Sequence, residues 1–163
     1  MKFDLNNPAF LQMASTKQQT PLTRMVLTED SDGEVRLSAN GLVIIEYMQG
    51  GEKVRNTYSA LIDTYVPIPA GVEATIYGEV TDINAAQDDS IFSLLDVSKN
   101  KALTDLSCND CTGLTSLDVS KNEALTNLSC SGCTGLTSLD VSKNTALTYL
   151  YCSGCRELTS LDV

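Results

Sequence analysis

Length, composition and charge already exclude several classes of protein. The chain has 163 residues, of which 42% are hydrophobic and 6% aromatic, enough for one substantial core or two small ones built mainly from aliphatic side chains. Its 11 basic and 21 acidic residues give a formal charge of −10 without a basic cluster, so nucleic acid is not an expected partner, and no apolar run reaches the roughly 18 residues of a membrane span.

The first 20 residues are expected to form a separate N-terminal segment. Asn7 followed by Pro8 and an apolar run predicts a short capped helix, because proline fits the first helical position, where its missing N–H costs nothing. The segment lacks the uninterrupted apolar stretch of a signal peptide. We therefore expect either a protein that stays inside the cell or one whose leader was removed before this chain begins.

Residues 21–79 predict a small antiparallel β cap domain. The stretches EVRLSA, LVIIEYM and KVRNTYSA have the composition of strands, and EATIYGEV adds another after the break at PIPAG. The Asn40-Gly41 pair predicts one tight hairpin, and QGGE predicts a second turn. Residues 80–91 match the repeat that follows only poorly and with one extra residue, as a degenerate first coil would.

Residues 92–163 form an internal repeat with a step of 22 residues. Each repeat divides into two elevens, such as LTSLDVSKNEA and LTNLSCSGCTG, which share the pattern Leu-x-x-Leu-x-(Val/Cys)-x-x-(Asn/Cys). The step is kept by the columns Leu95, Leu117, Leu139 and Leu161; Asp96, Asp118, Asp140 and Asp162; and Cys108, Cys130 and Cys152. Self-similarity of this kind predicts a mainly β solenoid, which with its degenerate first coil covers residues 80–163.

The alternation of side chains predicts how the coils stack. In each eleven, residues such as Leu128 and Cys130 point inward while Ser129 points outward, so each coil carries two short strands. Neighbouring coils lie about 4.8 Å apart along the axis and extend two parallel sheets. The repeated Asn100, Asn122 and Asn144 fall at the bend after a strand, where buried amides can satisfy the backbone groups that the bend leaves free.

The stretch LTSLDVSKNTALTYLYCSGC closely resembles the cysteine-ladder leucine-rich repeats of internalin J and of surface proteins from Bacteroides-type gut bacteria. The resemblance covers residues 92–163 and implies a bacterial protein at the cell surface or outside the cell. It is specific for the repeat class and says little about an individual function. One departure is that Cys111, Cys133 and Cys155 stand where many of these repeats have asparagine.

The three Cys-x-x-Cys pairs have three possible chemical roles. Their spacing fits a zinc ribbon, which makes a metal-binding protein one alternative. However, the repeat already explains the spacing, because Cys130 fills the slot of Val119 and Cys133 that of Asn122 in the sister eleven. Buried free cysteine behaves as a small hydrophobe, and stacked coils offer poor disulfide geometry. We favour a chemically inert ladder over metal binding and over disulfide or redox chemistry.

Catalysis has little support in the sequence. The chain contains no histidine, which is the commonest general base, and no glycine-rich phosphate loop with its Lys-Ser/Thr. We therefore expect no enzyme and no cofactor.

The aspartate column allows a cation site as an alternative to a solvated charged face. Stacked Asp118 and Asp140 would repel by roughly 0.8 kcal/mol per pair in water, which calcium could relieve. The lysines that recur three residues after the column, Lys99, Lys121 and Lys143, could relieve it equally well, and we favour that interpretation.

The outward columns of the Leu-x-Cys strands form the candidate ligand-binding face. They vary between coils, whereas the Leu-Asp-Val face repeats Ser and Asp almost unchanged. The candidates are Asp105, Ser107, Asn109, Asn127, Ser129, Ser131, Tyr149, Tyr151 and Ser153. Tyrosine is enriched at interface hot spots, although Tyr149 and Tyr151 could equally be a cross-strand aromatic cluster.

These observations predict a non-enzymatic interaction module that binds a protein or glycan ligand. The alternatives are a spacer or stalk without a ligand of its own and a metal-binding protein that uses the Cys-x-x-Cys pairs. The chain ends in mid-coil at Leu161, Asp162 and Val163, so we expect either further coils or an end-to-end homodimer through this open end.

Overall fold

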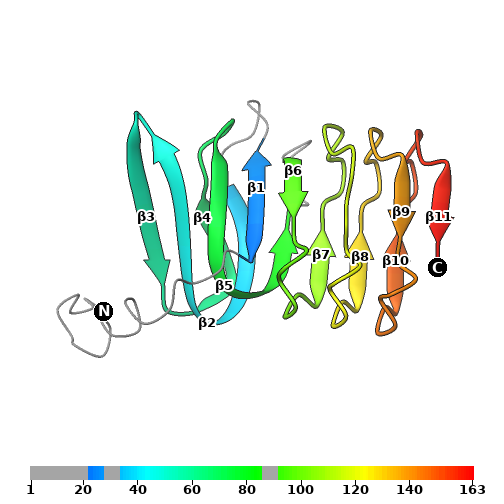
Figure 1. Cartoon of the computed structure of the whole chain (residues 1–163), viewed down its shortest axis with the longest axis horizontal. Helices are drawn as coiled ribbons and strands as arrows, with labels where there is room; N and C mark the ends of the chain where they lie inside the picture. The colour runs from blue at the N-terminus through cyan, green and yellow to red at the C-terminus, as the bar shows by residue number, and fades with distance from the viewer. Residues whose placement is uncertain (1–21, 28–33, 86–91) are drawn as a thin grey trace.

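The structure, a computed structural model, describes residues 22–27, 34–85 and 92–163. Figure 1 shows an elongated arrangement in which long strands at one end give way to a stack of coils that ends at the C-terminus. The predicted N-terminal helix lies outside the described residues. The strands are β1 (Thr23–Leu27), β2 (Glu34–Gln49), β3 (Glu52–Tyr58), β4 (Leu61–Pro67), β5 (Glu73–Asn84), β6 (Phe92–Asp96), β7 (Asp105–Ser107), β8 (Asn127–Ser129), β9 (Ser138–Asp140), β10 (Tyr149–Tyr151) and β11 (Ser160–Asp162).

The antiparallel part is organised around the long strand β2. One edge of β2 pairs with β4 and then with β3, and the other edge pairs with β5. The predicted turn at QGGE is confirmed: Gln49 pairs with Glu52, and Gly50 and Gly51 have φ of 60° and 85°. Positive φ at both positions is what a two-residue hairpin requires.

The hairpin predicted at Asn40-Gly41 is wrong, because β2 runs through both residues without reversing. Its two halves pair with β5 rather than with each other, and the register shifts between Asn40 and Ile44. Gly41 has φ 90° and lies near Gly78, which has φ 114°, and a Cβ on Gly78 would collide with the carbonyl oxygen of Leu42. The positive φ values of these glycines therefore produce a bulge that bends one long strand, and they do not form a hairpin turn.

The antiparallel strands and the coils share one sheet. β5 pairs antiparallel with β2, and its last residues, Asp82 to Asn84, pair in parallel with β7. Residue 79, the predicted end of the cap domain, lies inside β5. Over the described ranges the resulting sheet has nine strands and covers one hydrophobic cluster that extends from Met25 to Val141.

The C-terminal part is the predicted β-solenoid. β7, β8 and β10 stack in parallel with a step of 22 residues, and β9 and β11 form a second, two-stranded parallel sheet. Residues 116–118 occupy the equivalent position one coil earlier without forming a strand. The inward side chains Leu106, Leu128 and Cys130 are buried, as predicted, whereas Leu150 and Cys152 in the last coil are half-buried because no further described coil covers them.

An asparagine ladder holds the bends of successive coils together, as the sequence predicts. The Asn122 amide donates to the carbonyls of Val97 and Asn100 at 2.9 and 2.7 Å, and Asn144 repeats the pattern one coil later. Asn100 donates to the carbonyl of Val80 on β5 at 2.8 Å, so the ladder begins in the antiparallel part. All three asparagines are buried, where an unpaired carbonyl is costly.

We predict that Asn122→Ala lowers the free energy of unfolding by about 3 kcal/mol, because it removes two buried hydrogen bonds, to the carbonyls of Val97 and Asn100, and leaves a cavity. The matched control is Thr145→Ala, an exposed residue at the bend of the next coil, which should change stability by less than about 0.5 kcal/mol. Urea denaturation followed by circular dichroism measures both. Equal effects of the two substitutions would contradict a structural role for the ladder.

Candidate functional site

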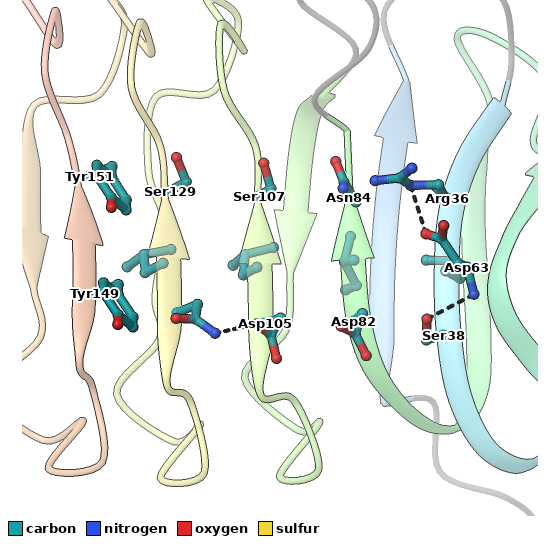
Figure 2. Close-up of a pocket in the computed structure, with 15 residues that line it drawn as sticks. Arg36, Ser38, Asp63, Asp82, Asn84, Asp105, Ser107, Ser129, Tyr149 and Tyr151 are labelled. Atoms are coloured by element: carbon teal, nitrogen blue, oxygen red, sulfur yellow. Dashed lines mark hydrogen bonds and ion pairs between the residues drawn. The ribbon is translucent and has the colours of Figure 1, made fainter.

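The outer face of the nine-stranded sheet carries two polar rows that run across the strands. The backbone register sets both rows, because paired residues on neighbouring strands project to the same side of a sheet. The first row is Arg36, Asn84, Ser107, Ser129 and Tyr151, and the second is Ser38, Asp82, Asp105, Asn127 and Tyr149. Figure 2 shows the tyrosines at one end of the rows and Arg36 and Ser38 at the other.

Between the two polar rows lies a buried row of aliphatic residues. Leu37, Ile83, Leu106 and Leu128 are at most 2% exposed, and they face the core. The strict alternation along each strand therefore turns every polar side chain of the two rows toward solvent. The same alternation fixes their spacing, since each strand contributes one residue to each row.

A groove with a cavity volume of about 520 Å³ follows these rows. It brings together six of the nine predicted candidates: Asp105, Ser107, Asn127, Ser129, Tyr149 and Tyr151. The other three, Asn109, Ser131 and Ser153, lie outside the groove at the turns that follow the strands. There Asn109 Oδ1 accepts hydrogen bonds from the Ser129 hydroxyl at 2.6 Å and the Ser131 N–H at 3.0 Å, and the Ser153 and Ser131 hydroxyls are 3.3 Å apart.

The antiparallel strands supply half of the groove, and the sequence analysis missed those residues. They are Arg36, Ser38, Asp63, Asp82 and Asn84. A signal for two of them is present, because Thr-Asp-Ile-Asn at 81–84 matches Thr-Asp-Leu-Ser at 104–107 once the extra residue of the degenerate coil is allowed for. Arg36, Ser38 and Asp63 give no such signal, since only the pairing of β2 with β5 brings their strands to the solenoid.

Asp63 joins β4 to the groove through two contacts. Its carboxylate forms an ion pair with Arg36, with Nε and Oδ1 2.9 Å apart, and its backbone N–H donates to the Ser38 hydroxyl at 3.0 Å. Its φ of 47° is unusual for a residue other than glycine. Figure 2 draws both contacts at the Arg36 end of the groove.

The middle of the groove carries two neighbouring carboxylates. Asp82 and Asp105 are register partners on β5 and β7. Asp82 accepts a hydrogen bond from the Thr81 hydroxyl at 2.7 Å, and Asp105 accepts one from the Asn127 amide. Among the described residues that line the groove, Arg36 is the one basic side chain against Asp63, Asp82 and Asp105, so the lining has a formal charge of −2.

Tyr149 and Tyr151 form the aromatic end of the groove. They lie two residues apart on β10, and their side chains project to the same side of the strand (Figure 2). Each tyrosine is 58% exposed, so neither ring is buried in an aromatic cluster. Exposed rings held on a strand are available as flat contact surfaces for a ligand.

The cysteines form an internal ladder that parallels the asparagine ladder. The Cys133 thiol donates to the carbonyl of Cys108, and the Cys155 thiol to that of Cys130, each at 3.0 Å and with the same 25-residue offset as from Asn122 to Val97. None of the six cysteines is in a disulfide, and the first four are buried while Cys152 and Cys155 are half-buried. Cysteine thus replaces asparagine in every second bend as a weaker donor.

The pKa shifts differ along the ladder. The hydrogen bond with Cys133, together with burial, raises the pKa of Cys108 well above its usual range, and burial raises the pKa of Cys130 and of Cys155, whereas the hydrogen bond with Cys108 lowers the pKa of Cys133. Since the thiolate is the form that attacks substrates and binds metals, the raised pKa values work against both roles at Cys108, Cys130 and Cys155. Within the described ranges, no three cysteine, aspartate or glutamate side chains converge as a metal ligand set would.

The aspartate column has a local structural role. Asp96, Asp118 and Asp140 each accept a hydrogen bond from the backbone N–H two residues later, at 2.9 to 3.0 Å. This contact stabilises the turn after each strand. The side-chain hydrogen bond from the Ser98 hydroxyl lowers the pKa of Asp96, and that of Ser142 lowers the pKa of Asp140.

A scan against protein-family models, a search of curated proteins and a search of solved structures each found no match for this chain. The resemblance to cysteine-ladder leucine-rich repeats therefore rests on the sequence pattern alone. Nothing helical among the described residues is long and apolar enough to cross a membrane.

We predict that a thiol reagent such as 5,5′-dithiobis(2-nitrobenzoate) distinguishes the last coil from the others. Cys152 and Cys155 should react in the native protein, and the remaining four cysteines should react at the rate of unfolding, because they are buried. All six thiols should react after the protein is denatured. Fast reaction of more than two thiols in the native protein would contradict burial of the other four. The control is the Cys152→Ser/Cys155→Ser variant, which should lose the fast phase of the reaction.

Proposed function

We propose that this protein is a non-enzymatic recognition module that binds a protein or glycan ligand in the groove formed by β2, β4, β5, β7, β8 and β10. The observation that carries the proposal is that the cap and the solenoid jointly line this groove. A solenoid that served only as a spacer between other domains would not need a groove lined by both of its parts. The antiparallel strands and the solenoid meet in the groove, and their polar and aromatic side chains point outward.

The composition of the groove supports binding. Tyrosine combines a large contact area with a polar tip, while serine, asparagine and aspartate offer hydrogen-bonding groups for peptide or sugar. The outward positions on the strands of the second sheet are Ser138, Asp140, Ser160 and Asp162, and Asp140 is engaged in its own turn. The difference between the two faces favours the groove as the ligand site.

The resemblance to surface leucine-rich repeat proteins supports a bacterial origin and a place at the cell surface. A non-enzymatic role fits a chain without histidine. The end-to-end homodimer stays a prediction, which light scattering at micromolar concentration decides.

The groove is tested by screening protein and glycan arrays with the wild type and with Tyr149→Ala/Tyr151→Ala. We expect the double variant to weaken binding by about 2 kcal/mol, the range of interface hot spots. The control is Ser116→Ala/Ser138→Ala, two exposed positions on the other side of the coils, which should bind as the wild type does. If every ligand binds both double variants equally, the groove is not the site and the spacer interpretation gains support.

The metal-binding alternative has a separate test. We expect EDTA to leave the melting temperature unchanged, because hydrogen bonds and packing account for the thiols. A structural zinc ion would contribute on the order of 10 kcal/mol to folding. A fall of many degrees in EDTA, reversed by added zinc, would favour the metal-binding protein.

A further inference from the structure

The charge distribution in the groove is unbalanced at one point. Asp82 and Asp105 lie on adjacent strands, whose backbones are about 4.8 Å apart, so their carboxylates repel each other. The hydrogen bonds that they accept come from the neutral groups of Thr81 and Asn127. The basic residue of the groove, Arg36, is already paired with Asp63.

The aspartate column on the other side of the coils differs from this pair. Asp118 and Asp140 accept backbone N–H groups, and Lys121 and Lys143 follow each of them three residues later. In the groove, the described lining offers no lysine and no second arginine. The site therefore has charge complementarity for a cationic group supplied by a ligand.

A simple cation does not fit the arrangement well. Calcium takes six to eight oxygen ligands, whereas no three acidic side chains converge among the described residues. A lysine or arginine side chain needs fewer partners, because it can bridge two carboxylates with its own N–H donors. The exposed tyrosines add a second feature that suits such a ligand, since guanidinium and ammonium groups bind to aromatic faces.

The distance between the Asp82–Asp105 pair and the tyrosines further defines the ligand. Tyr149 lies in the same row as Asp105 and two strands away, which places it about 10 Å from that carboxylate along the groove. A peptide in the extended polyproline II conformation advances about 3.1 Å per residue with three residues per turn, so two side chains three residues apart lie on the same face and span this distance.

We propose, on the basis of the recognition function above, that the groove binds a basic peptide that crosses the strands in the extended polyproline II conformation. One arginine or lysine lies between Asp82 and Asp105, and another, three residues along the peptide, stacks on Tyr149 or Tyr151. The net charge of −10 of the whole chain attracts such a ligand at long range. A neutral glycan could stack on the tyrosines but would leave the carboxylate repulsion unrelieved.

The probe is a short fluorescein-labelled peptide in which arginine recurs at every third position among glycine and serine. Its binding is followed by fluorescence anisotropy and compared with a peptide of the same composition with all arginines adjacent, with a glutamate version and with neutral cellohexaose. We expect the spaced arginine peptide to bind most tightly, the glutamate version and cellohexaose not to bind, and rising NaCl to weaken the complex.

Matched variants inside and outside the groove test where the peptide binds. Asp82→Asn/Asp105→Asn keeps the shape and one acceptor oxygen of each residue and should weaken peptide binding about tenfold, as should Tyr149→Ala/Tyr151→Ala. Tyr149→Phe/Tyr151→Phe keeps the rings and should retain binding. Glu123→Gln/Glu157→Gln removes the same charge from exposed positions outside the groove and should change the affinity less than twofold. Thermal melting confirms that each variant is folded.

Three results would overturn the proposal: no binding of the spaced peptide, equal loss in the Glu123→Gln/Glu157→Gln control, or no loss in the Asp82→Asn/Asp105→Asn variant. If cellohexaose or an array ligand binds in a tyrosine-dependent manner while the arginine peptide does not, the recognition function stands and the basic ligand is wrong. If no ligand depends on Tyr149 and Tyr151, the groove itself is excluded and both proposals fail together.

Discussion

The pairing of β5 with strands from both parts of the molecule is the interaction on which the rest of the structure depends. One edge of β5 lies antiparallel to β2, and the other edge lies antiparallel to β1 over Glu73–Ile76 and parallel to β7 over Asp82–Asn84. Since a solenoid coil cannot bury its inner face alone, the first coil needs a surface that continues its sheet and covers its core. β5 supplies that surface, and Asn100, which donates to the carbonyl of Val80, fixes the first bend against the same strand.

The regular stacking of the later coils follows from the pairing of β7 with β5. Once β7 is in register with β5, each later strand is placed by the same parallel hydrogen bonds, and each bend is closed by an amide or a thiol that reaches one coil back. Asparagine provides strong donors at one bend and cysteine provides weak ones at the other. Cysteine is small enough for the core and still donates a hydrogen bond, which gives the thiols a structural role.

The same register aligns the groove. Side chains contributed by five strands of different length and connectivity fall into straight rows because paired residues share a face. The repeat supplies small polar groups at constant spacing, while the strands outside the repeat add Arg36 and Asp63 and the last coil adds the two tyrosines. A ligand that crosses the strands therefore meets different chemistry at each step, which is a basis for specificity that identical coils could not provide.

The sequence by itself determined the solenoid, because a 22-residue step repeats in three columns and because side chains alternate with period two along a strand. It determined the buried asparagine column, the inward cysteines and the glycine turn at QGGE for the same local reasons. Only the tertiary structure decided that Asn40-Gly41 bends β2 instead of reversing it, since the choice depends on whether both flanking segments can pair with β5, a strand more than thirty residues away. It also decided that Arg36, Ser38 and Asp63 join the groove, because long-range antiparallel pairing, which leaves no periodic trace in the chain, brings them beside Asp82 and Asp105.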